Sequence, residues 1–229
     1  PIICINAAVF LAFIASNPAG RLGGMMFRHF VHAPGMTGKT YTMLTSTFAH
    51  QTPLHILFNT VAFWSFGTIA LMSSQFARAS PFSASEHERQ LRASRSERLP
   101  GESSLTPHFL AFYCTAGTFA ALVSHLVLVV RFRRAIMTSP ARLYPNAHNN
   151  AQLSEKLLKI GSHASLGASG AVYAMIAMTA CAVPDTRVQL IFLPFFSFPL
   201  AYGVAGAVAF DVAGVLFKFA RFDHWAHLG

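Results

Sequence analysis

Five apolar stretches, each close to the length of a membrane-crossing helix, limit what this 229-residue chain can fold into. Crossing the hydrocarbon core takes about 20 apolar residues, because an α-helix rises about 1.5 Å per residue through about 30 Å. Only 11% of the residues are charged, against about 25% in ordinary soluble domains. We therefore expect an all-α polytopic membrane protein. The stretches are Pro1–Ser16, Leu54–Met72, Phe109–Val130, Ala164–Val183 and Val188–Phe217, with a sixth opening at about His224.

Polar segments separate the apolar stretches. Residues 73–108 are rich in Ser, Arg and Glu, and residues 131–163 carry six basic side chains and one acidic one. Both are typical of solvated connectors, with surface helices or lipid-facing basic patches as the alternative. The last long stretch, Val188–Phe217, contains Pro194 and Pro199. It predicts a tilted or kinked helix, because proline removes a backbone hydrogen-bond donor.

The charge balance indicates a lipid partner and not a nucleic acid. Seventeen Lys and Arg residues against eight Asp and Glu give a net charge of +9. These basic residues lie between the apolar stretches and are not interleaved with aromatic residues on one face, so anionic lipid headgroups are the expected partners. We expect residues 1–229 to form a single membrane domain. Because the chain opens on Pro1 and stops at Gly229, we expect that domain to be incomplete at both ends.

The first polar cluster is the sequence HQTPLHILFN at the start of the second apolar stretch. His55 and Asn59 are four residues apart, so on a helix they lie on the same face, one turn from each other. A polar group in such a place is costly unless it is hydrogen-bonded or used. The pair is therefore a candidate polar site. His50 points elsewhere, and a packed, hydrogen-bonded histidine is the simpler interpretation for it.

The second cluster is GASGAVYAM at the start of the fourth stretch, where Gly167 and Gly170 flank Ser169. Small residues at these spacings also allow membrane helices to pack closely, which is the alternative interpretation. The G-x-S-x-G turn of soluble hydrolases looks similar but follows a strand, and GSHASL does not resemble one. The pattern instead places Ser169 at the beginning of a helix.

The third cluster is FDHWAHLG at the end of the chain. Asp223 stands where an N-cap residue would begin a sixth helix, and His227 follows one turn later, with His224 as the competing histidine. Helices two, four and six of a serial bundle all begin on the same side of a bilayer. The three clusters therefore share one membrane face. A hydroxyl, an imidazole and hydrogen-bond donors together are a minimal set for acyl transfer.

At these residues the chain resembles the rhomboid family of intramembrane serine proteases. HQTPLHILFN resembles the second-helix motif of the family, GASGAVYA its serine motif and AHLG the start of its last-helix histidine motif. The segment from Leu166 to Gly229, with IFLPFF and AFDVAG, is most similar to the mitochondrial, presenilin-associated rhomboid-like branch. The resemblance implies a six-helix bundle whose sixth helix is truncated in this chain. It also implies a place in the mitochondrial inner membrane.

The resemblance implies a role for each matching residue. Ser169 would be the nucleophile and His227 its general base, in a dyad without the aspartate of soluble serine proteases. His55, Asn59 and the Ser169 backbone N–H would form the oxyanion hole.

Two further positions would support this site. Gly167 precedes the serine, and Tyr173, one turn after it, matches an aromatic residue that packs against the catalytic imidazole, with simple core packing as the alternative. The expected substrates are membrane proteins with a single transmembrane helix, and no cofactor or metal is implied.

Two other functions remain open at this point. One is a catalytically inactive rhomboid-like protein that binds client helices, although such relatives typically lose the serine or the histidine. The other is a metal-dependent membrane oxidase, because His50 with His55 and His224 with His227 have the spacing of histidine boxes. That class needs adjacent histidine pairs, and the sequence contains neither a His-His pair nor an H-E-x-x-H motif.

Overall fold

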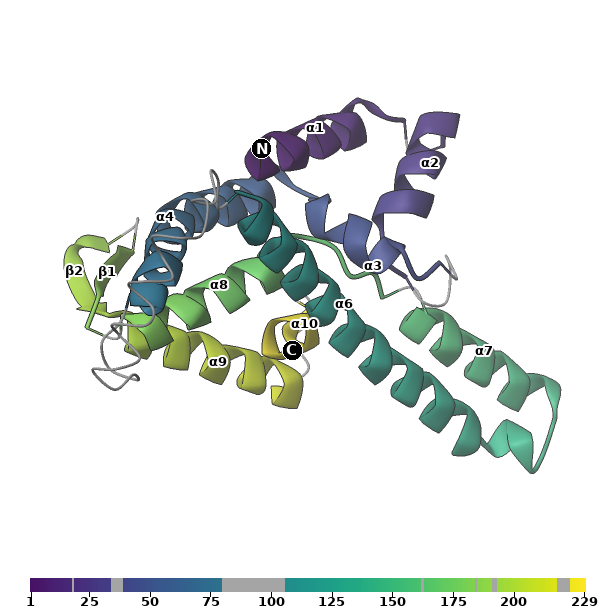
Figure 1. The fold of residues 1–229 in the computed structure, drawn as a ribbon. Coiled ribbons are helices and arrows are strands. Elements are labelled where there is room, and N and C mark those ends of the chain that lie inside the picture. The colour runs from purple at the N-terminus through teal and green to yellow at the C-terminus, as the bar shows by residue number, and fades with distance from the viewer. Residues whose placement is uncertain are drawn as a thin grey trace.

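The computed structural model describes residues 1–17, 19–33, 39–79, 106–161, 163–183, 185–190, 193–217 and 223–229. Most of these residues are helical, and the long helices lie side by side as a bundle (Figure 1). The elements in chain order are α1 (Ile2–Ala15), α2 (Arg21–Phe30), α3 (Thr42–Thr45), η1 (Ser46–Phe48), α4 (Pro53–Ala79), α6 (Thr106–Met137), η2 (Pro140–Arg142), α7 (Ala147–Gly161), α8 (Ser169–Ala182), β1 (Arg187–Leu190), β2 (Leu193–Pro199), α9 (Leu200–Phe217) and α10 (His224–Leu228).

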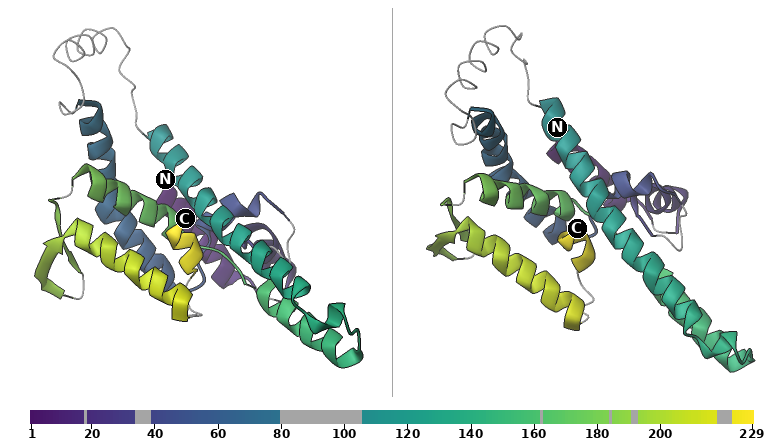
Figure 2. Two further views of the ribbon diagram at one scale, coloured as in Figure 1. Left: turned by 90° about the horizontal axis from the view of Figure 1, so that it is seen from below. Right: turned by 60° about the horizontal axis from the view of Figure 1, so that its bottom comes forward.

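Helix α8 is the centre of the bundle. It packs against α4, α6 and α9, and the short α10 fits between α6, α8 and α9 (Figure 2). Small side chains permit this close approach: a Cβ atom at Gly170 of α8 would lie 2.3 Å from the Cβ atom of Ala120 in α6. Tyr113 of α6 closes the core beside α8, where its hydroxyl donates to the carbonyl of Thr47 at 3.2 Å.

Helix α4 begins at the HQTP sequence because its capping residues are correctly placed. The Thr52 hydroxyl accepts a hydrogen bond from the backbone N–H of His55 at 3.2 Å. Pro53 occupies the first helical position, where its missing N–H costs nothing. Together they fix the first turn of α4 and so the direction in which His55 projects.

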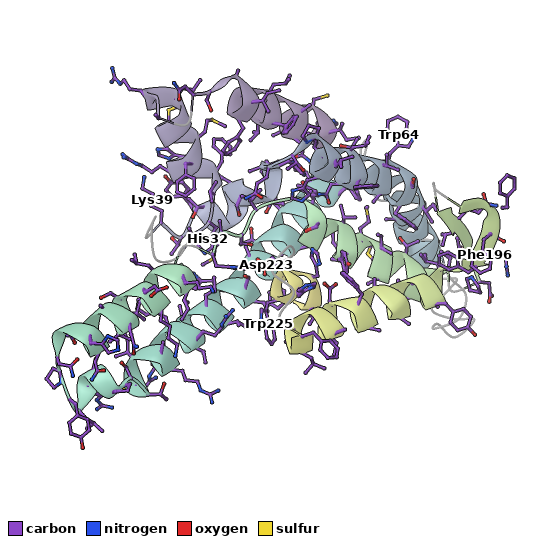
Figure 3. All side chains as sticks on the ribbon, turned by 180° about the vertical axis from the view of Figure 1, so that it is seen from behind. His32, Lys39, Trp64, Phe196, Asp223 and Trp225 are labelled. Carbon is purple, nitrogen blue, oxygen red and sulfur yellow. The ribbon has the colours of Figure 1, made fainter. Side chains whose placement is uncertain are left out.

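The expectation of an all-α membrane protein is confirmed, apart from one short hairpin. Within the described ranges, Phe109–Met137 and Leu200–Phe217 are long and apolar enough to cross a membrane, and α1 and α8 are shorter apolar helices. Trp64 of α4 and Phe196 of β2 point outward (Figure 3) and are 73% and 62% exposed. Outward-facing aromatic side chains of this kind suit the membrane and its boundary.

The prediction of one long kinked helix over Val188–Phe217 is wrong. Residues 187–190 and 193–199 form an antiparallel hairpin, and α9 begins only at Leu200. The sequence LPFFSFP is rich in aromatic residues, which favour strands, and its prolines lie at strand ends. The hairpin leads directly into α9. The Leu200 N–H donates a hydrogen bond to the carbonyl of Thr186 at 2.8 Å and so fixes the start of this helix.

Residues 131–163 are largely helical and not an irregular connector, which agrees with the alternative prediction of a surface helix. Helix α6 continues to Met137, and α7 then runs back along it as a second helix (Figure 1). In α7, Leu153, Leu157 and Ile160 are half-buried, while most of the remaining residues are exposed. This spacing marks one apolar face of a helix. Of the other predicted connector, residues 73–79 belong to α4 and 106–108 to α6, and the rest lies outside the described residues.

Candidate active site

Ser169 is the first residue of α8, and the turn before it depends on Gly167. Gly167 has a φ of +121°, in the region that only glycine enters readily. A Cβ atom there would lie 2.7 Å from the imidazole ring of His55. The Gly167 N–H also bonds the carbonyl of Ser46 at 2.9 Å. The turn at Gly167 therefore packs against both η1 and α4, and it places Ser169 at the start of α8.

The structure brings Ser169 and His227 together, although 58 residues separate them. The distance from Ser169 Oγ to His227 Nε2 is 2.8 Å, the length of a normal hydrogen bond. Tyr173 of α8 stacks on the His227 ring, with centroids 4.4 Å apart and planes 13° from parallel. The imidazole is thus held between a hydroxyl at its edge and a phenol ring at its face.

Helix α10 carries His227 on a well-capped first turn. Asp223 accepts a hydrogen bond from the backbone N–H of Ala226 at 3.2 Å, as an N-cap residue does. The same carboxylate accepts the hydroxyl of Ser124, at 2.8 Å to one oxygen and 3.0 Å to the other. This ties the start of α10 to α6 and fixes which side of the short helix faces Ser169.

Of the two histidines that the sequence left in competition, only His227 is hydrogen-bonded to the serine among the described contacts. His224 instead places its Nδ1 2.6 Å from a carboxylate oxygen of Asp211 in α9. The same oxygen lies 3.1 Å from Nδ1 of His227. Both histidines therefore share one acidic partner.

Asp211 is the residue that sequence reasoning missed. The resemblance implied a dyad without an aspartate, yet this carboxylate lies at the far nitrogen of His227 and its side chain is 0% exposed. A signal was present. Asp211 is the single acidic residue in the five predicted apolar stretches. An ionisable group inside such a stretch marks a functional site by default, because burying it is costly.

His55 and Asn59 belong to α4, and His55 lies against the turn at Gly167 that precedes Ser169. The His55 ring covers Gly167, and it meets the ring of His50 edge to face, with centroids 5.0 Å apart. Asn59 is buried, and its amide donates to the carbonyl of His55 at 3.1 Å. The structure therefore places His55 against the serine turn, with the Asn59 amide bonded one helical turn away within α4.

An apolar cavity of about 780 Å³ lies beside the site, with α6, α8 and α9 along its walls. His227 and Tyr173 line it where it meets α10. Within the part of the chain that the structure describes, no group of three or more His, Cys, Asp or Glu side chains is arranged to hold a metal ion.

Comparison with known proteins points to one family. The chain matches the Rhomboid domain over residues 37–79 and 102–229. The presenilin-associated rhomboid-like protein, mitochondrial, of Rattus norvegicus is 27% identical to it, and that of Homo sapiens 26%, in each case over the whole chain and 44% of the relative. Presenilin-associated rhomboid-like protein A, mitochondrial, of Danio rerio is 22% identical over 89% of the chain and 38% of the relative.

The chain thus spans less than half the length of these curated relatives. No solved structure shows significant similarity to it.

Proposed function

The chain belongs to the rhomboid family, and on this premise we propose that it is an intramembrane serine endopeptidase that uses Ser169 as nucleophile and His227 as general base. The observation that carries the proposal is the 2.8 Å contact between Ser169 Oγ and His227 Nε2. A nucleophile and a base must lie within hydrogen-bond reach for the proton to move as the new bond forms. This chain has both of these groups.

The reaction follows the acyl-enzyme route of serine hydrolases. His227 Nε2 takes the proton of the Ser169 hydroxyl while Oγ attacks the scissile carbonyl carbon. The tetrahedral intermediate then collapses, the C–N bond breaks, and the imidazolium returns the proton to the leaving amine. A water molecule, deprotonated by the same imidazole, hydrolyses the resulting ester and restores the serine.

The oxyanion would be stabilised by donors at the start of α8. The Ser169 N–H is free of an α-helical partner at the N-terminus of a 14-residue helix, where the helix dipole also favours negative charge. His55, which covers the serine turn, and Asn59, one turn further along α4, would add side-chain donors. The Asn59 amide has two N–H donors, and the bond to the His55 carbonyl uses one of them, so the other is available to the oxyanion.

The substrates we propose are membrane proteins with a single transmembrane helix. A scissile carbonyl inside a helix is hydrogen-bonded and shielded, so the segment must unwind before Ser169 can attack. The relatives are named mitochondrial, and we propose the mitochondrial inner membrane as the location of this protein. Membrane lipid is the other expected partner.

The test is cleavage of a single-span reporter by the full-length protein in liposomes, with a fluorophosphonate probe to label the nucleophile. We expect Ser169→Ala to abolish both cleavage and labelling, and His227→Ala to reduce labelling at least 100-fold. Ser139→Ala, which changes a serine that caps η2, is the matched control and should behave as the wild type. Cleavage by the Ser169→Ala protein at the wild-type rate would refute the assignment. A wild-type protein that binds the reporter without cutting it would instead favour a client-binding role.

A further inference from the structure

Asp211 is a buried carboxylate in the apolar helix α9, and its two histidine neighbours explain its presence there. Helix α9 has a mean hydropathy of 1.8, and the Asp211 side chain is fully buried in it. Within the described contacts, the hydrogen bonds of its Oδ1 atom go to Nδ1 of His224 and Nδ1 of His227. Burying a carboxylate is costly, and the two charge-assisted hydrogen bonds to Oδ1 offset part of that cost.

These contacts determine where the proton sits on His227. An ionised carboxylate only accepts hydrogen bonds, so the imidazole atom facing it must be an N–H. Nδ1 faces Asp211 at 3.1 Å and therefore carries the hydrogen. In a neutral ring the other nitrogen, Nε2, then has a free lone pair, and this is the atom that faces the Ser169 hydroxyl. Only this tautomer can take the serine proton.

The same carboxylate also fixes the direction of the His227 ring. Because His224 and His227 are one turn apart on α10, two bonds to one oxygen clamp that turn against α9. The fit is tight, since a Cβ atom at Gly214, one turn beyond Asp211, would lie 2.2 Å from the His224 ring. Three helices thus define the ring position: α8 through Ser169 and Tyr173, α10 through the backbone, and α9 through Asp211.

We infer that Asp211 is a positioning residue for His227, holding it in the tautomer that accepts the serine proton and stabilising the imidazolium that forms during acyl transfer. This inference rests on the proposed function. The titratable and charged groups around His227 are His224 and Asp223 on its own helix, Tyr173 on α8, His55 on α4 and Asp211 on α9. Asp211 is the acidic member of this set that contacts the ring.

The decisive variant is Asp211→Asn, which keeps the shape of the side chain and removes its charge. We expect kcat to fall about 100-fold with KM changed less than about threefold, a smaller loss than the roughly 10⁴-fold of soluble triads because Tyr173 still holds the ring. The acidic limb of the kcat/KM profile should move to lower pH, because the imidazolium loses its counter-charge. A purely structural role would not move that limb.

Asp185→Asn is the matched control, because it makes the same chemical change at an exposed aspartate between α8 and β1. We expect the kcat and the pH profile of this variant to stay close to those of the wild type. Equal activity and equal profiles for Asp211→Asn and Asp185→Asn would overturn the inference while leaving the serine-protease function intact.

A second measurement does not depend on turnover. The ¹⁵N spectrum of histidine-labelled protein, with His227 assigned by its loss in His227→Gln, reports which ring nitrogen carries hydrogen. We expect a protonated Nδ1 and a bare Nε2 in the Ser169→Ala protein, and a mixture of tautomers after Asp211→Ala in the same background. Hydrogen on Nε2, or a tautomer unaffected by Asp211→Ala, would overturn the inference whether or not the protein proves to be a protease.

Discussion

The phenol ring of Tyr173 lies parallel to the imidazole of His227, with ring centroids 4.4 Å apart and 13° between the planes. One turn of α8 separates Tyr173 from Ser169, so the helix that presents the proposed nucleophile also supports the ring face of the proposed base. A stacked pair of this kind contributes about 0.5–1.5 kcal/mol beyond its buried area.

The stacking predicts different outcomes for two replacements of Tyr173. Tyr173→Ala leaves the His227 ring unsupported, and we expect kcat to fall about 10-fold, as a loss of about 1.4 kcal/mol would produce. Tyr173→Phe keeps the aromatic ring, so its kcat should fall distinctly less than that of Tyr173→Ala. Probe-labelling rates of both variants in the full-length protein check this. Equal losses for Ala and Phe would mean that the hydroxyl, and not the stacking, matters.

The turn at Gly167 predicts a cost with two separable parts. Gly167→Ala forces an alanine into a left-handed conformation, at about 1–2 kcal/mol, and places a Cβ atom 2.7 Å from the His55 ring, at about 1–3 kcal/mol more. The double variant Gly167→Ala/His55→Ala removes the collision and keeps the strain. Thermal unfolding should therefore show Gly167→Ala losing more stability in the wild-type background than in the His55→Ala background. Equal losses in both would contradict the contact.

Packing between α9 and α10 predicts that Gly214 cannot be enlarged. The Cβ atom of an alanine there would meet three atoms of the His224 ring at 2.2–2.5 Å and push α10 away from α9. We expect Gly214→Ala to lose about 1–3 kcal/mol of stability, and to lose activity because His227 moves with α10. Gly206→Ala on the same helix meets no atom within 4 Å and should stabilise by about 0.4–1 kcal/mol. A tolerated Gly214→Ala would refute the proposed packing.

The position of Asn59 predicts a loss confined to catalysis. Removing one oxyanion donor typically lowers kcat about 100- to 1000-fold, so we expect Asn59→Ala to fall in this range with little change in KM. Its amide bonds the carbonyl of its own helix in the resting site, so stability should change little. Steady-state kinetics in liposomes measures the effect. A rise in KM with kcat unchanged would exclude Asn59 from the oxyanion hole.

Two buried histidines predict that acid destabilises the fold. Burial, with a smaller effect of His125, lowers the pKa of His32 to about 4 against the opposing effect of Asp223. Burial and the nearby His55 lower the pKa of His50 to about 4 as well. An unfolded histidine has a pKa of about 6.5, so between these values the unfolded chain binds protons that the folded chain does not. Stability should therefore be fully present above about pH 7 and fall as the pH is lowered toward 4.

Thermal unfolding in detergent between pH 7.5 and 5 measures this dependence. His50→Phe keeps a flat ring that cannot take a proton, so the midpoint of this variant should decline less steeply on acidification. A wild-type midpoint that is constant or rises as the pH falls would contradict the prediction.

The sequence predicted a bundle of apolar helices, and the structure has one. Hydropathy located five apolar segments that correspond to α1, α4, α6, α8 and α9, and the N-cap at Asp223 predicted the sixth helix, α10, which begins at His224 as expected. The parity of the helix starts predicts that the serine and histidine clusters share one face, and the resemblance to the rhomboid family is what selects His227 over His224. The catalytic roles of Ser169 and His227 stay predictions until the variants are measured.

What the sequence did not disclose depends on contacts between distant segments. Apolarity alone cannot separate a strand from a helix, so the hairpin before Leu200 was taken for part of α9. The polar composition of residues 131–163 concealed the apolar face of α7, which spans only three side chains. Being the lone acidic residue in the apolar stretches marks Asp211 as unusual, but its partners lie 13 and 16 residues further along the chain, and only folding brings them within hydrogen-bond distance.

The polar groups at the centre of this molecule come from three different helices, with Ser169 on α8, Asp211 on α9 and His227 on α10. A hydrogen bond of 2.8 Å is lost when its atoms separate by about 1 Å, a displacement that slight tilting of one helix produces. Packing against neighbouring helices sets the tilt of a membrane helix, and a mismatch with the bilayer thickness shifts it. We therefore expect a thinner or thicker host bilayer to change the rate of the proposed proton transfer without any change in the amino-acid sequence.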